Sequence, residues 1–267
     1  MRIGVLGAGG RMGREVCRAV AEDDGLELVA AVDPALAGID VRQVAGIDAP
    51  GLHVAADPEE LMRAGAEVAV DFTVASAAVS NLRWCADNGV HAVAGTSGMP
   101  ASDVDELRTR FAGSAANCVI AANFAIGAVL MTRFCELAAP FLDGVEIIEL
   151  HHDGKLDAPS GTAVHAAERM AAARAAAGAS WPEDATTSVV VDGARGGVGP
   201  GGIHIHSVRL RGLVAHQEVV FGAVGQSLTI RHDAYDRSSF MPGVLMAVRA
   251  VIDRPGLTLG LGPLLGF

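Results

Sequence analysis

The sequence predicts an α/β fold in which a doubly wound parallel sheet is combined with a second, α+β domain that contains a mixed or antiparallel sheet. Two observations predict it. Over roughly the first 120 residues, short apolar runs alternate with helical patterns, which is typical of parallel sheets with right-handed crossovers. Beyond residue 123, helices are followed by runs in which apolar and polar residues alternate, which is typical of a sheet with one exposed face.

Each predicted strand of the first part is a short β-rich run, and each predicted helix has apolar residues at helical spacing. The predicted strands are residues 2–6, 26–32, 68–72, 92–94 and 118–121. The predicted helices are residues 11–22, 59–64, 75–88 and 101–111. Strand and helix alternate throughout, so we expect the strands to lie parallel with helices on both faces.

The second part has a different order of elements. Its predicted helices are residues 126–141, 162–177 and 240–252. Its predicted strands are residues 145–150, 204–210, 216–221 and 227–232. The turns between the last three strands are short and contain glycine, which predicts antiparallel hairpins. Residues 193–202 are rich in glycine and predict a mobile loop.

Composition excludes several classes of function. The chain has 267 residues, of which 51% are hydrophobic, enough for two packed domains. Its net charge is −11 and it has no basic run, which argues against a nucleic-acid partner. We expect no membrane span, since the longest alanine-rich stretch carries charges. The four cysteines are far apart and have no CxxC spacing, so we expect buried, reduced thiols and a cytoplasmic protein.

A glycine-rich turn follows the first predicted strand and precedes the first helix. It reads GAGGRMG and comprises Gly7, Ala8, Gly9, Gly10, Arg11, Met12 and Gly13. Small residues at such a turn let backbone N–H groups approach a pyrophosphate, and the helix N-terminus adds partial positive charge. A strict GxGxxG pattern would require glycine where Met12 stands. The turn nevertheless predicts a bound dinucleotide rather than a merely structural turn.

Asp33 ends the second predicted strand, about twenty residues beyond the turn, where a carboxylate can accept hydrogen bonds from ribose hydroxyls. A carboxylate there repels the 2′-phosphate of NADPH and favours NADH. Arg11 lies close enough on the turn to soften this preference, so we expect the cofactor to be NADH, NADPH or both.

Two further loops follow predicted strands at what should be the same, carboxyl edge of the sheet. Their candidate cofactor-binding residues are Gly95, Thr96, Ser97, Ala121, Ala122, Asn123 and Phe124. Loops on that edge line the cofactor crevice of a doubly wound sheet. Either loop alone could be an ordinary turn, but their shared edge favours a role in binding.

The segment 149–162, ELHHDGKLDAPSGT, holds the densest group of reactive side chains. His151, His152 and Lys155 leave a strand, and Ser160 is the expected N-cap of a helix whose first residues are Gly161 and Thr162. A helix N-terminus beside imidazoles and a lysine can hold carboxylates, and histidine titrates in the range that general acid catalysis needs. The alternative is a solvated loop with a helix cap.

Metal binding is a weaker interpretation. The segment has neither an HExxH pattern nor a nearby cysteine. His204 and His206 share one face of a predicted strand, and His216 and His232 lie in later strands. We interpret these four as surface or interface histidines and expect no metal site.

Together these segments resemble the dihydrodipicolinate reductase family, also called 4-hydroxy-tetrahydrodipicolinate reductase. The resemblance runs from residue 1 to about residue 265 and includes the glycine turn, GTSG at 95–98, AANFAIG at 121–127 and the segment 149–163. The last two matches, near the C-terminal end, are LVAHQEVVFG and LTIRHDAYDRSSF. The 149–163 segment is very specific, whereas the glycine turn is shared by many dehydrogenases.

The resemblance implies a Rossmann domain of residues 1–122 completed by residues 241–267, with residues 123–240 forming a substrate-binding domain that assembles a homotetramer. It implies that His151 is the proton donor/acceptor, that Lys155 is the second catalytic cation, and that His152, Ser160, Gly161 and Thr162 bind a substrate carboxylate. The implied reaction is NAD(P)H-dependent reduction of 4-hydroxy-tetrahydrodipicolinate, with loss of water, in diaminopimelate and lysine biosynthesis. The implied dinucleotide contacts are Gly7 to Met12, Asp33, Gly95 to Ser97 and Ala121 to Phe124.

Two departures from the family pattern concern the pocket. Asp153 and Gly154 replace residues that are often basic, which makes the mouth of the pocket less positive, and Ala125 stands where many relatives have serine. Two other functions remain open at this point: a different two-domain dehydrogenase that acts on an amino acid or a sugar, and a redox sensor that binds the dinucleotide without catalysis.

Overall fold

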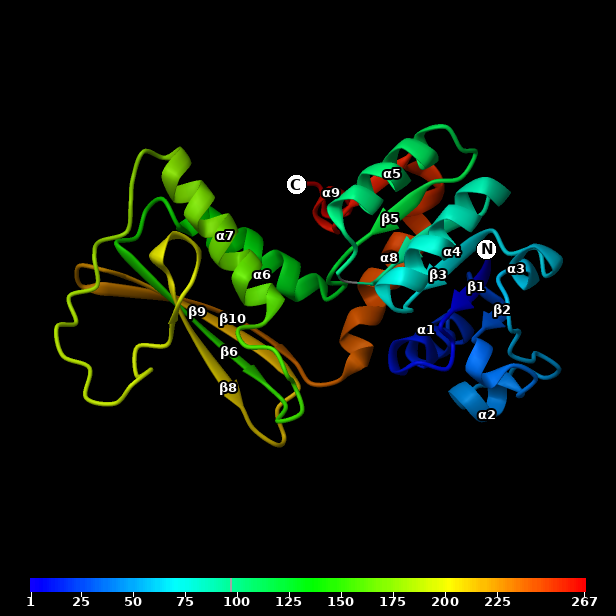
Figure 1. Ribbon diagram of the computed structural model, residues 1–267, viewed down its shortest axis with the longest axis horizontal. Coiled ribbons are helices and arrows are strands. Elements are labelled where there is room, and N and C mark those ends of the chain that lie inside the picture. The colour runs from blue at the N-terminus through cyan, green and yellow to red at the C-terminus, as the bar shows by residue number, and fades with distance from the viewer. Residues whose placement is uncertain (97) are drawn as a thin grey trace. The chain divides into compact units, whose positions relative to one another are not determined.

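The computed structural model describes residues 1–96 and 98–267, so the predicted cofactor contact Ser97 lies outside the described residues. The chain divides into two compact units (Figure 1). Unit 1 comprises Met1–Ile126 and Arg237–Phe267, and unit 2 comprises Gly127–Asp236. Unit 1 is therefore built from two stretches of the chain that are separated by the whole of unit 2.

Unit 1 contains a six-stranded sheet with the order β11-β5-β4-β3-β1-β2, and its neighbouring strands pair in parallel. The strands are β1 (Arg2–Leu6), β2 (Glu27–Val32), β3 (Val68–Asp71), β4 (His91–Ala94), β5 (Cys118–Ile120) and β11 (Leu257–Leu259). The chain builds outward from β1 in one direction to β2 and in the other from β3 to β11. The carboxyl ends of β1 and β3 therefore flank the switch point at which doubly wound sheets bind ligands.

Helices cover both faces of this sheet, as the alternating sequence pattern predicts. They are α1 (Arg11–Ala21), α2 (Val41–Ala45), α3 (Glu59–Arg63), α4 (Ala75–Asn88), α5 (Ala101–Ala112), α8 (Met241–Ala250) and α9 (Gly262–Leu265). Because crossovers are right-handed and the strand order reverses at β1, α1 lies on one face and α4 and α5 lie on the other. Helix α8 contacts α1 and so joins its face, although it comes from the C-terminal stretch.

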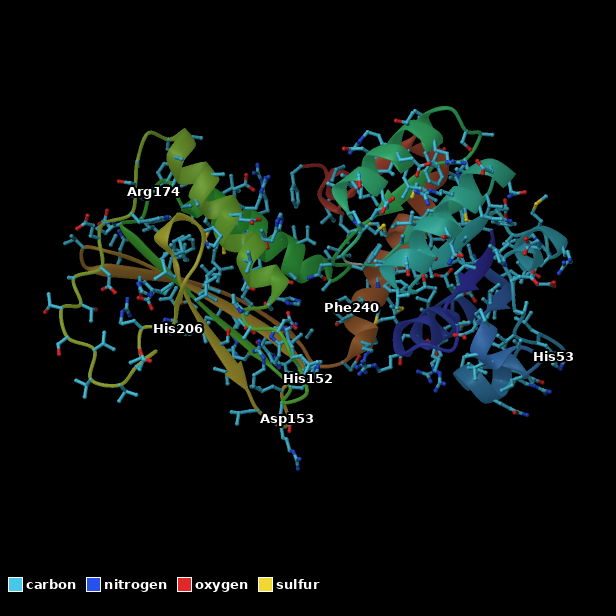
Figure 2. The ribbon with its side chains drawn as sticks, in the orientation of Figure 1. His53, His152, Asp153, Arg174, His206 and Phe240 are labelled. Carbon is cyan, nitrogen blue, oxygen red and sulfur yellow. The ribbon has the colours of Figure 1, made fainter. Side chains whose placement is uncertain are left out.

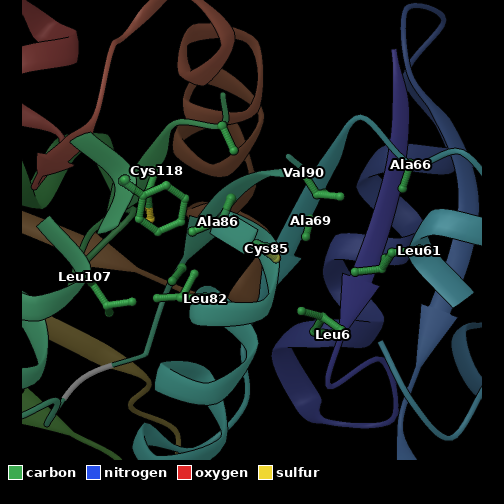
Figure 3. Packing of buried hydrophobic residues seen from close by; sticks show 14 of the residues in the cluster. Leu6, Leu61, Ala66, Ala69, Leu82, Cys85, Ala86, Val90, Leu107 and Cys118 are labelled. Carbon is green, nitrogen blue, oxygen red and sulfur yellow. The ribbon is translucent and has the colours of Figure 1, made fainter. Parts of the chain in front are cut away.

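The core of unit 1 lies between the sheet and its helices (Figure 3). Leu82 of α4, Leu107 of α5 and Leu61 of α3 are fully buried. They pack against strand residues that are mostly small, such as Ala69 and Ala92, which let the helices approach the sheet closely. This close packing fixes the helices against the sheet, and the candidate cofactor loops lie at the carboxyl edge of that sheet.

All four cysteines are free and buried, as the sequence predicts. Burial raises the pKa of the Cys17 thiol to about 12, so this group stays protonated at neutral pH. No helix in the described part of the chain is long and apolar enough to cross a bilayer.

Unit 2 contains a five-stranded mixed sheet with the order β10-β9-β6-β8-β7. Its strands are β6 (Gly144–His151), β7 (Gly197–Val198), β8 (His204–Arg209), β9 (Ala215–Ala223) and β10 (Gln226–Ala234). Helices α6 (Ile126–Ala138) and α7 (Gly161–Ala176) supply Met131 and Met170 to a buried cluster that also contains Ile147 and Phe221 from the sheet. Alanines at the buried positions of α7 bring this helix close to the strands.

The prediction of successive hairpins is wrong for β8 and β9. Strand β6 lies between them, parallel to β8 and antiparallel to β9. Only β9 and β10 form the expected antiparallel hairpin, around Gly225. The central position of β6 buries Ile147 and Glu149 between two neighbouring strands.

The glycine-rich stretch 193–202, predicted as a mobile loop, contains regular structure. Strand β7 pairs antiparallel with β8, and a 3-10 helix follows at Pro200–Gly202. Gly201 has a φ of 69° and a Cβ there would lie 2.5 Å from the Cβ of Ala171. Gly201 therefore serves a close approach to α7.

Candidate active site

The glycine turn joins β1 to α1 at the carboxyl edge of the unit 1 sheet. Gly7, with a φ of 77°, and Ala8 both donate their N–H groups to the carbonyl of Val32. A Cβ on Gly13 would lie 2.0 Å from the carbonyl oxygen of Gly7, so the helix approaches the strand end as closely as only glycine allows. Gly10 is the N-cap of α1 and offers no side-chain cap. The first N–H groups of this 11-residue helix thus lie ready for an anionic group.

Asp33 follows β2 and lies against the turn. Its Oδ2 accepts a hydrogen bond from the N–H of Gly9 at 2.9 Å, and its Oδ1 accepts one from Ala35 at 3.1 Å. A Cβ on Gly9 would lie 2.7 Å from Oδ2, which explains why glycine stands there. Each oxygen keeps a lone pair that a ribose hydroxyl can reach. Arg11, the first residue of α1, is exposed.

The other predicted cofactor residues that the structure describes lie at the same edge. Gly95 donates its N–H to the carbonyl of Asp71, and Ala121 donates to that of Ala94. The structure therefore places the loop after β4 beside the end of β3, and the loop after β5 beside the end of β4. The remaining members of these loops are Thr96, Ala122, Asn123 and Phe124.

Sequence reasoning missed the residues at the carboxyl end of β3, beginning with its last residue, Asp71. Asp71 is fully buried and accepts hydrogen bonds from Thr73 and Asn81, and burial raises the pKa of its carboxyl group. The Phe72 ring fills the space at Gly95, where a Cβ would lie 2.0 Å from it. The signal was the sequence Asp-Phe-Thr directly after a buried strand, a polar group at the carboxyl edge next to the glycine turn.

In unit 2, the carboxyl end of β6 presents Glu149 and His151 on one face of the sheet, because side chains two apart along a strand point the same way. The Nδ1 of His151 lies 2.5 Å from Oε2 of Glu149, whose side chain is completely buried. The backbone N–H of Ser160 donates to Oε1 of the same carboxylate at 3.1 Å. Glu149 thus joins the histidine to the start of α7.

Arg209 ends β8 and is in register with His151. Its Nη1 and Nη2 donate to the two oxygens of Glu149 at 2.9 and 2.8 Å, and Nη2 also donates to the carbonyl of Asp157 at 2.7 Å. A planar guanidinium suits such a two-pronged contact. Sequence reasoning did not find Arg209, which stands about sixty residues from its partner.

The charges of this group perturb one another. Burial raises the pKa of Glu149, but hydrogen bonds from Arg209, Ser207 and His151 outweigh it and leave the pKa below its ordinary value. Burial lowers the pKa of His151, and the hydrogen bond with Glu149 opposes part of this effect. The carboxylate is therefore ionised at neutral pH, and the imidazole releases a proton more readily than a free histidine.

Lys155 is the only lysine in the 267-residue sequence. Its Nζ donates to both carboxylate oxygens of Asp157, at 2.7 and 2.8 Å. The Asp157 side chain is 62% exposed, so this ion pair is open to exchange with an incoming carboxylate. Figure 2 shows the adjacent His152 and Asp153 together in the loop after β6; Asp153 pairs with Arg211.

The N-terminus of α7 lies in the same segment. Ser160 is its N-cap, as predicted, and Oγ accepts the N–H of Ala163 at 3.2 Å. The hydroxyl proton of Ser160 remains able to donate, and Gly161 and Thr162 form the first helical residues. A carboxylate in front of this 16-residue helix would meet N–H groups and the positive end of the dipole.

Three of the four histidines in the later strands contact carboxylates. His206 contacts Glu146, His204 contacts Asp184, and His216 contacts Asp233. Within residues 1–96 and 98–267, no three His, Cys, Asp or Glu side chains converge as a metal site would require.

One buried side chain near the candidate residues lacks a partner. Gln217 of β9 is 4% exposed and in register with Glu149, yet neither atom of its amide is hydrogen-bonded within the described part of the chain. An unpaired buried amide is costly to fold.

Comparison with known proteins gives a consistent result. Residues 1–124 match the model "Dihydrodipicolinate reductase, N-terminus" and residues 127–265 match "Dihydrodipicolinate reductase, C-terminus". The chain is 50% identical over 266 residues to the 4-hydroxy-tetrahydrodipicolinate reductase of Nocardia farcinica, covering 99% of this chain and 98% of the relative. It is 49% identical to that of Cutibacterium acnes, covering 100% and 99%.

A solved structure, a dipicolinate-bound dihydrodipicolinate reductase from Paenisporosarcina sp. TG-14, is similar with a TM-score of 0.86 and 37% identity, covering 98% of both chains. An amine dehydrogenase from Mycobacterium smegmatis has a TM-score of 0.61 at 16% identity, covering 97% of this chain and 94% of that one. The second similarity shows the fold alone.

Proposed function

Because the chain belongs to the dihydrodipicolinate reductase family, we propose that it reduces 4-hydroxy-tetrahydrodipicolinate to tetrahydrodipicolinate with loss of water, in diaminopimelate and lysine biosynthesis. The observation that carries the proposal is the run of His151, Lys155 and the α7 N-terminus after β6. These groups give local positive charge in a chain of net charge −11. The substrate is a dicarboxylate, which needs such a site.

The cofactor is NADH or NADPH, and the residues of unit 1 fit it. The fit rests on the uncapped N-terminus of α1 and on a turn that no larger side chain could adopt at Gly7 or Gly13. The proposed contacts are Gly7, Ala8, Gly9, Gly10, Arg11, Met12, Asp33, Gly95, Thr96, Ser97, Ala121, Ala122, Asn123 and Phe124. When bound, the nicotinamide supplies a hydride.

Unit 2 provides the substrate site in this proposal. Lys155 gives up its ion pair with Asp157 and binds one substrate carboxylate. The same carboxylate accepts hydrogen bonds from the N–H groups of Gly161 and Thr162 and from the Ser160 hydroxyl. His152 adds a second polar contact. The imidazolium form of His151 gives its proton from Nε2 as the substrate ring is reduced, and the neutral imidazole that results keeps its other proton on Nδ1, which Glu149 holds.

The test is to follow the absorbance of NADH and of NADPH with the purified protein and substrate made in situ by the synthase that precedes it. We expect oxidation of at least one cofactor, and a fall in kcat of roughly 10²- to 10⁴-fold for His151→Gln, in line with loss of a general acid. His165→Gln, on the exposed face of α7, is the matched control and should keep full activity. No oxidation of either cofactor would refute the proposal.

The single lysine allows a test that needs no turnover. Reductive methylation with ¹³C-formaldehyde labels two kinds of amine, the N-terminus and Lys155. Adding dipicolinate should shift the ¹³C signal of Lys155 and leave that of the N-terminus in place. A shift in neither signal would contradict the role of Lys155.

We also propose that the protein is a cytoplasmic homotetramer. Family resemblance supports the assembly, and the four free thiols support a reducing compartment. Sedimentation equilibrium of the purified chain at micromolar concentration tests the assembly, and a monomer would contradict it.

A further inference from the structure

Glu149 receives an unusual number of hydrogen bonds for a buried carboxylate. His151 Nδ1, Ser160 N, and Nη1 and Nη2 of Arg209 all lie within hydrogen-bond distance of its two oxygens. Ser207 also gives Glu149 a hydrogen bond, and two carboxylate oxygens have about four lone-pair sites, so the carboxylate has no acceptor capacity left over. The side chain is completely buried and has no access to solvent.

The two-pronged contact with Arg209 makes Glu149 an obligate acceptor. A buried carboxylate alone would take up a proton, whereas a guanidinium in contact with both oxygens keeps it ionised. An ionised carboxylate has no proton to donate, so the proton in the 2.5 Å contact belongs to Nδ1 of His151. The neutral ring then carries its only proton on Nδ1, and Nε2 is left as the nitrogen that exchanges protons.

From this geometry we propose that Glu149 and Arg209 form a positioning pair, which sets the tautomer and orientation of His151 so that Nε2 delivers the proton to the substrate. The inference rests on the proposed function for the role of His151. Neither member of the pair touches the substrate. Arg209 acts on Glu149, and Glu149 acts on the imidazole.

The pair also sets the charge around His151. The charged groups near the ring are Glu149 on its own strand, Arg209 on β8, and Lys155 with its partner Asp157 in the loop after β6. On the other side, the β9 residue in register is the uncharged Ala215. The carboxylate favours the imidazolium and both cations oppose it, so the two members of the pair have opposite effects on the proton affinity of the ring.

The first measurement uses the unmodified protein. In ¹⁵N-histidine-labelled protein, with the His151 signal assigned by its loss in His151→Gln, we expect the neutral ring to be protonated at Nδ1. A ring protonated at Nε2 would overturn the proposal. This readout needs no substrate, so it is independent of whether the proposed reaction is correct.

The second measurement uses two variants with opposite expected signs. Glu149→Gln removes the negative charge and should lower the pH at which His151 titrates, whereas Arg209→Met should raise it. In turnover, the alkaline limb of kcat should shift the same way in each case, with kcat falling roughly 10²-fold or more in Glu149→Gln and KM changing far less. Shifts in the same direction for both variants, or none, would overturn the proposal.

A second glutamate on β6 offers a matched control for the titration of His151. Glu146, on the opposite face of β6, also contacts a histidine and an arginine, through Nε2 of His206 at 2.7 Å and Nη2 of Arg195 at 2.6 Å. Glu146→Gln should leave the titration of His151 unchanged. If Glu146→Gln shifted His151 as much as Glu149→Gln, the effect would be general and the proposed pair would be refuted.

Discussion

His91 shows how one side chain can tie the stability of unit 1 to pH. It begins β4, and its Nδ1 accepts a hydrogen bond from the N–H of Asn117 at 3.0 Å. A protonated ring has no lone pair at Nδ1 and would lose this bond. Burial lowers the pKa of His91 below its ordinary value of 6.5, with Glu67 opposing part of the effect.

We therefore expect unit 1 to lose stability on acidification. Because the folded-state pKa lies below 6.5, the contribution of His91 is complete above that value and is lost as pH falls through the folded-state pKa. His91→Leu should show a smaller fall in Tm between about pH 8 and about pH 5 than the unmodified protein. His53→Leu, which changes an exposed histidine of the same unit, should keep the original slope. Equal slopes for both variants would contradict this account.

Replacing Gln217 should increase the stability of the protein. Its buried amide lacks partners within residues 1–96 and 98–267, so Gln217→Leu removes two unpaired polar atoms at similar volume. We expect the free energy of unfolding to rise by about 1 to 3 kcal/mol, measured by urea denaturation. Gln43→Leu, on the exposed face of α2, should change it by less than about 0.5 kcal/mol. A loss of stability in Gln217→Leu would show that the amide is paired.

At the scale of elements, the junction of β1 and α1 depends on the absence of a side chain. A Cβ on Gly13 would overlap the backbone oxygen of Gly7 at 2.0 Å, and backbone atoms cannot rotate away. Gly13→Ala should therefore destabilise unit 1 by about 1 to 3 kcal/mol and weaken binding of NADH, as judged by thermal unfolding and fluorescence titration. Gly113→Ala, where the nearest atom would lie 3.8 Å away, should alter neither. Equal losses in the two variants would refute the steric explanation.

The sequence predicts elements well where local signals agree. Helix α4 begins at Ala75 and ends at Asn88 as predicted, because Gly89 follows in the left-handed conformation that ends helices. Strand β11 and helix α2 were not predicted, since three and five residues carry too little periodicity. The position of β6 between β8 and β9 was not predicted either, because strand order depends on long-range pairing rather than on local pattern.

In the candidate site too, residues with a local sequence signal were predicted and residues without one were not. The segment after β6 was found because its histidines, lysine and helix cap are adjacent in sequence, and the N-cap at Ser160 is confirmed. Arg209 could not be found, because it reaches Glu149 only through the register of β6 and β8. The roles of the site residues in binding and catalysis stay predictions.

At the scale of the whole molecule, unit 1 needs both of its stretches. Helix α8 from the second stretch buries Val244, Ala247 and Val248 completely, and β11 covers the edge of β5. A fragment of residues 1–126 should therefore unfold without a cooperative transition. Joining it to residues 237–267 by a short Gly/Ser linker should restore cooperative melting, followed by circular dichroism. A cooperative 1–126 fragment would contradict this prediction.

The same discontinuity has a consequence for synthesis on the ribosome. Domains are made from the N-terminus onward and tend to fold in that order. Here β1 emerges first, yet its sheet lacks α8 and β11 until every residue of unit 2 has been translated. Unit 2 can thus complete its fold ahead of the unit that precedes it. The nascent chain must keep the bare edge of β5 from pairing with a neighbouring polypeptide during that interval.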